Sequence, residues 1–126
     1  MSSAGTSQTI LLVDDDPVHI KFLENILTNN GYRIVAKSEA AEGLQFAIEQ
    51  NPSLIVLDVM MPIINGYNFC RLLKSEVRQK HIPVIFLTSR DEAEDIEIGR
   101  QMGANAYLTK PVNTQVLLDK IKELLK

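Results

Sequence analysis

The stretch TILLVDDDP, residues 9–17, begins as an apolar run and passes directly into three acids and a proline. Three further apolar runs also end at polar residues, which are Asp58, Thr88, and Thr109 followed by Lys110. If the four runs are parallel strands, their ends bring carboxylates, a hydroxyl and an ammonium to one edge of a sheet. Open α/β sheets bind ligands at that edge. We therefore expect the functional site there.

Outward from this stretch, apolar runs alternate with segments of helical periodicity five times. The expected strands are residues 9–13, 32–37, 53–58, 84–88 and 105–109. A helix is expected after each strand, and the first four helices end near residues 30, 50, 78 and 103. Five such units with short connections predict an α/β fold, a doubly wound five-stranded parallel sheet with helices on both faces.

Capping residues mark several helix starts. Asp16 before Pro17 has the pattern of an N-cap followed by proline at the first helical position. We expect Ser38 to cap the second helix, despite Gly43 inside it, and Asn113 to cap the last one.

Composition indicates one small domain. The chain has 126 residues, of which 45% are hydrophobic and 23% charged, as in average globular proteins. We expect residues 1–8 to form a flexible tail and residues 9–126 the domain.

The net charge of -3, without a basic cluster, argues against direct nucleic-acid binding. The chain contains no membrane-length apolar run and no secretion signal, and its single Cys70 fits a reducing compartment, so we expect a cytoplasmic protein.

The acids at the strand ends need a cation. Asp14, Asp15 and Asp58 would lie close together, and two unit charges about 4 Å apart repel by roughly 4 kcal/mol at an effective dielectric near 20. Oxygen ligands with room for water suit Mg²⁺. Lys110 and Thr88 add a positive charge and a donor, so the group suits phosphoryl transfer. Asp58 stands alone at its strand end and is the best nucleophile.

These residues occur in an order and spacing that resemble a known family. The chain is similar over about residues 9–126 to receiver domains of two-component response regulators, of the single-domain, CheY-like kind. The motifs that carry the resemblance are Val13-Asp14-Asp15, Leu57-Asp58 followed by Met61-Pro62 and Gly66, Thr88-Ser89, and Tyr107 through Lys110-Pro111. The resemblance implies the flavodoxin-like strand order 2-1-3-4-5, which is known for this family and does not follow from the residues themselves. It also implies a cis Lys110–Pro111 bond.

The resemblance further implies roles for the acids. Asp58 would accept a phosphoryl group from a sensor histidine kinase or a histidine phosphotransfer protein. Asp15, Asp58 and the carbonyl of Met60 would bind Mg²⁺, with Asp14 acting mainly through water. Lys110 would pair with the carboxylate and then with the phosphoryl group. Catalysis would be limited to the protein's own phosphorylation and dephosphorylation.

Other implied roles concern switching. Thr88 would bond the phosphoryl oxygen and Tyr107 would turn inward, which changes the affinity of the fourth helix, fifth strand and fifth helix for a downstream protein. Met60 and Arg90 lie beside the phosphoryl group in such domains and would tune its lifetime. We expect a monomer or a phosphorylation-linked dimer that contacts neither nucleic acid nor membrane and has little or nothing attached to the receiver.

Alternative interpretations remain open at this point. Each residue taken singly fits an ordinary role, such as a cap, a loop acid or core packing, and only their conjunction indicates a site. Asp14-x-Asp16-x-Val18 also fits the nucleophile motif of haloacid-dehalogenase-like phosphatases, although Pro17 interrupts it. A phosphate-independent interaction module is a third interpretation. His19 and His81 have no second ligand at metal spacing, so we assign them structural or solvent roles.

Overall fold

The computed structural model describes residues 8–58, 66–76, 81–88, 97, 100–101 and 103–125, with residues 66, 67 and 88 described by their backbone alone. The strands are β1 (Thr9–Val13), β2 (Arg33–Lys37), β3 (Leu54–Asp58), β4 (Val84–Thr88) and β5 (Ala106–Thr109). The helices are α1 (Pro17–Asn29), α2 (Ala40–Gln50), α3 (Gly66–Lys74) and α5 (Thr114–Leu124). Of the helix expected before residue 103, the described residues 97, 100 and 101 are helical. None of the described helices has both the length and the apolar character of a membrane span.

The strands form one parallel sheet in the order β2-β1-β3-β4-β5. This confirms the predicted doubly wound fold and its strand order. Val13 at the end of β1 pairs with Leu57 of β3, and Thr88 at the end of β4 pairs with Thr109 at the end of β5. Because the strands are parallel and in this register, their carboxyl ends lie along the same edge of the sheet.

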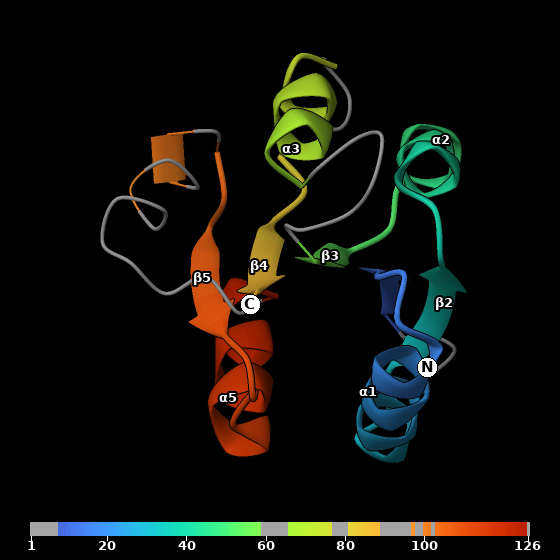
Figure 1. The fold of residues 1–126 in the computed structure, drawn as a ribbon, viewed down its shortest axis with the longest axis vertical. Coiled ribbons are helices and arrows are strands. Elements are labelled where there is room, and N and C mark those ends of the chain that lie inside the picture. Colours follow the sequence, from blue (N-terminus) through green and yellow to red (C-terminus); the bar gives the residue numbers. More distant parts are fainter. Residues whose placement is uncertain are drawn as a thin grey trace.

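Helices cover the sheet on both faces, with α1 and α5 on one side and α2 and α3 on the other (Figure 1). Alternate strand residues supply the two cores, since successive side chains on a strand point to opposite faces. β3, in the centre, is buried throughout, as its unbroken apolar sequence predicts. The core under α2 and α3 includes Leu11, Val13, Ile55, Leu57, Phe69 and Phe86. The core under α1 and α5 includes Ile10, Leu12, Leu27, Val56, Ile85 and Ile121.

Two predicted helix limits were wrong. Ser38 does not cap α2, because the helix begins at Ala40 and its cap position is Glu39, whose side chain makes no capping bond. Ala40 is buried in the core, so packing of the first turn places this helix start rather than a polar cap. α3 ends at Lys74 and not near residue 78, because the amide of Ser75 bonds the carbonyls of both Arg71 and Leu72 as the last turn tightens.

The cap predicted for the last helix is confirmed. Asn113 precedes α5, and its side-chain Oδ1 accepts a hydrogen bond of 3.1 Å from the amide of Val116. The Lys110–Pro111 peptide bond just upstream is cis, as the resemblance implies. Together these residues define how the chain leaves β5 and enters α5.

Candidate functional site

Three charged side chains meet at the carboxyl edge of the sheet, and strand alternation explains why. Val56 of β3 and Leu108 of β5 both pack into the core under α1 and α5. Side chains two positions apart on a strand point to the same face, so Asp58 and Lys110 extend on that side. Asp14 directly follows β1, the neighbour of β3. The topology therefore brings residues from three separate parts of the chain into contact.

Lys110 is shared equally between two buried acids. Its Nζ lies 3.4 Å from Oδ2 of Asp14 and 3.4 Å from Oδ2 of Asp58. The two acids are only 5% and 7% exposed. Both distances are long for a charge-assisted hydrogen bond, whose usual length is about 2.7–2.9 Å. The ammonium is thus held between the carboxylates and bonded closely to neither.

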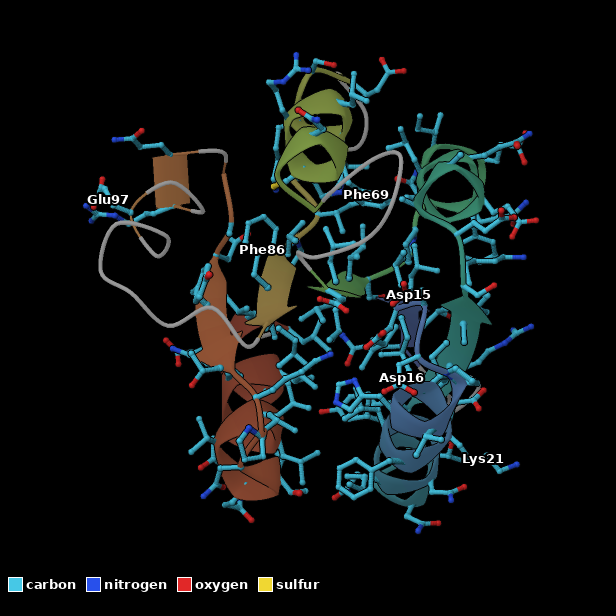
Figure 2. All side chains as sticks on the ribbon, in the orientation of Figure 1. Asp15, Asp16, Lys21, Phe69, Phe86 and Glu97 are labelled. Atoms are coloured by element: carbon cyan, nitrogen blue, oxygen red, sulfur yellow. The ribbon has the colours of Figure 1, made fainter. Side chains whose placement is uncertain are left out.

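Asp15 completes an acidic cluster that fits a divalent cation. Its side chain is exposed at the junction of β1 and α1 (Figure 2). One carboxylate oxygen each from Asp14, Asp15 and Asp58 lie within 4.8 Å of one another. Lys110 pairs with Asp14 and Asp58, and a cation bound among the three carboxylates would further reduce their mutual repulsion. Carboxylate oxygens are the hard ligands that Mg²⁺ prefers, and the exposure of Asp15 leaves room for the waters that a bound Mg²⁺ keeps.

Asp16 organises the turn between the acids and α1. Its Oδ1 accepts hydrogen bonds from the amides of Val18, at 3.0 Å, and His19, at 3.4 Å. Its own amide donates to Oδ1 of Asp14 at 2.9 Å. The predicted N-cap is therefore confirmed, and it ties the start of α1 to the acidic cluster.

His19 belongs to the site, although its sequence context pointed only to a structural or solvent role. Its Nδ1 lies 2.6 Å from Oδ2 of Asp14, and its side chain is 15% exposed. A signal was present in the cap, since Asp16 as N-cap makes residue 19 the third helical residue, N3. A side chain at N3 reaches back over the helix start, as the glutamate of a capping box does.

Tyr107 and Thr88, predicted to form a switch pair, lie on the neighbouring strands β5 and β4. Tyr107 of β5 pairs with Phe86 of β4, and their rings meet edge to face with centroids 6.1 Å apart. The tyrosine is half-buried against the core under α2 and α3. Thr88 is the last residue of β4, beside Thr109, and its side chain is not described. Met60 and Arg90, predicted to tune phosphoryl lifetime, lie outside the described residues.

Comparison with known proteins points to one family. The chain matches the family model described as the response regulator receiver domain over residues 10–122. It is 38% identical over 118 residues to the transcriptional regulatory protein AfsQ1 of Streptomyces coelicolor, with 94% of this chain and 51% of AfsQ1 covered. It is 34% identical over 116 residues to the protein PilH of Pseudomonas aeruginosa, with 92% of this chain and 96% of PilH covered. The chain thus spans about half the length of some curated relatives and nearly all of another.

A solved receiver domain has the same fold. The crystal structure of the receiver domain of the sensor histidine kinase PA1611 of Pseudomonas aeruginosa matches with a TM-score of 0.88 and 29% identity. The match covers 95% of this chain and 98% of that one. That structure holds a magnesium ion coordinated in its active site cleft. In this chain, the acidic cluster formed by Asp14, Asp15 and Asp58 is the candidate metal site.

Proposed function

Because this chain belongs to the response regulator receiver domain family of two-component systems, we propose that it is a phospho-acceptor switch that takes a phosphoryl group onto Asp58. The donor is a phosphohistidine on a sensor histidine kinase or a histidine phosphotransfer protein, in the cytoplasm. The observation that carries the proposal is the buried Asp58 carboxylate at the end of the central strand, 3.4 Å from the Lys110 ammonium and within an acidic cluster that fits a cation.

Asp58 is the acid best placed to react. Both oxygens of Asp14 already accept hydrogen bonds or an ion pair, from the amide of Asp16, from His19 and from Lys110. Asp15 is exposed at the start of the turn into α1. Asp58 is at the centre of the sheet edge, between the strands that carry the other candidate groups. Asp15 and Asp14 are therefore better suited to hold a cation and its waters.

The proposed reaction exchanges one phosphorus bond for another. An oxygen of Asp58 attacks phosphorus, the phosphorus–nitrogen bond of the donor breaks, and its electron pair returns to the imidazole. The Lys110 ammonium would pair with the Asp58 carboxylate before the transfer and with a phosphoryl oxygen after it. The hydroxyl of Thr88 is proposed to donate to a phosphoryl oxygen. Bound Mg²⁺, held by Asp15, Asp58 and the carbonyl of Met60, would neutralise charge on the phosphoryl oxygens. Water would later hydrolyse the acyl phosphate, with Met60 and Arg90 affecting its access.

The output of the switch is a change in protein binding. Phosphorylation would draw Thr88 inward and allow Tyr107, now half-buried against Phe86, to pack more deeply. The surface made by the helix before residue 103, β5 and α5 would then change its affinity for a downstream protein or for a second copy of the chain. This proposal includes no DNA contact by the receiver itself and no catalysis beyond its own phosphorylation and dephosphorylation.

Intact-mass measurement with a small phosphodonor tests the proposal. Wild-type protein incubated with acetyl phosphate and Mg²⁺ should gain the mass of one phosphoryl group, and borohydride reduction followed by peptide mapping should locate it at Asp58. Asp58→Asn should gain nothing. Asp119→Asn, which changes an exposed acid on α5, should behave as wild type. Absence of the adduct in wild type, or its retention in Asp58→Asn, would overturn the proposal.

A further inference from the structure

Asp14, which precedes α1, is contacted by side chains from two different parts of the chain. Oδ2 of Asp14 lies 2.6 Å from Nδ1 of His19 on α1 and 3.4 Å from Nζ of Lys110 beyond β5. Oδ1 of the same carboxylate accepts the amide of Asp16. The contact with His19 is by far the shorter of the two at Oδ2. The orientation of this buried acid is therefore dominated by α1 and its cap rather than by the lysine.

The chemistry of the pair assigns the hydrogen. An ionised carboxylate only accepts hydrogen bonds, so Nδ1 of His19 must carry the hydrogen that it donates to Asp14. Bonds of this kind are stronger than neutral ones and restrict both side chains. His19 has little freedom to leave, because its backbone amide is bound to the cap residue Asp16 and its ring is mostly buried.

We propose that His19 is a positioning residue that turns the Asp14 carboxylate toward α1 and so limits its hold on Lys110. This inference rests on the phospho-acceptor function proposed above. With Asp14 satisfied by His19, the ammonium stays midway between the two acids and is available to Asp58 and to a phosphoryl oxygen. The negative charge offered to a cation then comes mainly from Asp15 and Asp58.

Removal of the His19 donor should slow phosphorylation but tighten Mg²⁺ binding. Without His19, Lys110 is the one described side chain that still contacts Oδ2 of Asp14, so the ammonium is drawn toward Asp14 and away from Asp58. Phosphorylation at saturating Mg²⁺ should slow. Asp58, which then keeps less of the Lys110 charge, offers more negative charge to a cation, so Mg²⁺ should bind more tightly. General damage to the fold would instead weaken both cation binding and phosphorylation.

Three variants separate these outcomes. His19→Leu keeps apolar bulk but removes the donor, whereas the amide nitrogen of His19→Asn takes the place of Nδ1 and keeps it. His81→Leu is the matched control at the chain's other histidine, which is exposed. Calorimetric titration with Mg²⁺ alone gives the Kd, acetyl phosphate at saturating Mg²⁺ gives the phosphorylation rate, and thermal melting without metal reports on folding.

Only His19→Leu should bind Mg²⁺ more tightly and yet be phosphorylated more slowly. In His19→Leu we expect a Kd for Mg²⁺ lower by about 3-fold and a phosphorylation rate lower by about 10-fold, the size of effect typical of one hydrogen bond to a charged group. His19→Asn and His81→Leu should remain within about 2-fold of wild type in both measurements. An unchanged His19→Leu, weakened binding together with slowed labelling, or no rescue by His19→Asn would overturn the inference. Failure of the proposed function looks different, because wild type itself would then not be labelled.

Discussion

Gly43 of α2 lies directly against Val13 of β1, so that a Cβ on the glycine would come 2.7 Å from one methyl of the valine and 3.2 Å from the other. Val13 is the last residue of its strand, immediately before Asp14. Glycine at this helical position costs about 1 kcal/mol relative to alanine. The close approach of α2 to the strand that carries the acids explains why this helix contains it.

Gly43→Ala should therefore destabilise the protein despite the better helix propensity of alanine. Overpacking of a core costs about 1–3 kcal/mol, which exceeds the gain in propensity. Urea denaturation should show a lower free energy of unfolding, and phosphorylation should slow because Val13 shifts next to the acids. The double variant with Gly43→Ala and Val13→Ala should lose less stability than the sum of the losses in the two single variants. Simple additivity in this double-mutant cycle would contradict the contact.

Asp15→Ala should remove the response to Mg²⁺ while leaving the fold intact, because the side chain is exposed. In wild type, Mg²⁺ at ten times its Kd should stabilise the protein by about 1.4 kcal/mol through linkage. Thermal melting with and without Mg²⁺ measures the difference, and acetyl phosphate labelling should be lost in parallel. Glu42→Ala, at an exposed acid on α2, is the control. A Mg²⁺ response that survives in Asp15→Ala would remove this residue from the metal site.

Asp58→Asn should raise the stability of the metal-free protein by about 1 kcal/mol, because it lowers the number of carboxylates that repel one another around one ammonium. Lys110→Met should lower the stability, because it removes the ammonium that Asp14 and Asp58 share. Urea denaturation in the presence of a chelator measures both. The surface change Asp119→Asn should stay within about 0.5 kcal/mol of wild type. A loss of stability in Asp58→Asn would show that the acids are not in electrostatic conflict.

Cys70 should resist alkylation until the protein unfolds. Burial raises the pKa of its thiol from 9.0 to about 11, although the nearby Lys74 ammonium lowers it in part. Burial favours the neutral thiol, so the reactive thiolate appears near pH 9 in the unfolded chain and near pH 11 in the folded one. At pH 8 the folded protein should have about 100-fold less thiolate. Iodoacetamide labelling with and without denaturant, followed by mass spectrometry, checks this. Rapid labelling of the native protein at pH 8 would contradict it.

Much of the fold follows from local patterns. The strand positions, the caps at Asp16 and Asn113, and the parallel sheet agree with the structure. These features depend on neighbours within a few residues, where periodicity and capping chemistry act. The predicted start of α2 was wrong because burial of Ala40, which is set by the sheet below it, outweighs the capping preference of Ser38. The strand order was predicted from the family resemblance, because periodicity alone does not determine it.

Local sequence was enough to predict which chemical groups reach the carboxyl edge of the sheet, because each acid or lysine directly follows an apolar run and parallel strands end together. It could not predict how those groups are shared. The equal distances from Lys110 to Asp14 and Asp58 join parts of the chain that no local pattern relates. The N-cap at Asp16 indicates that His19 reaches back toward the acids, but not that its ring contacts Asp14 at 2.6 Å. Such distances depend on how α1 and the segment after β5 pack on the sheet. Hydrogen bonds and ion pairs change with fractions of an ångström, whereas periodicity specifies only the face on which a side chain lies.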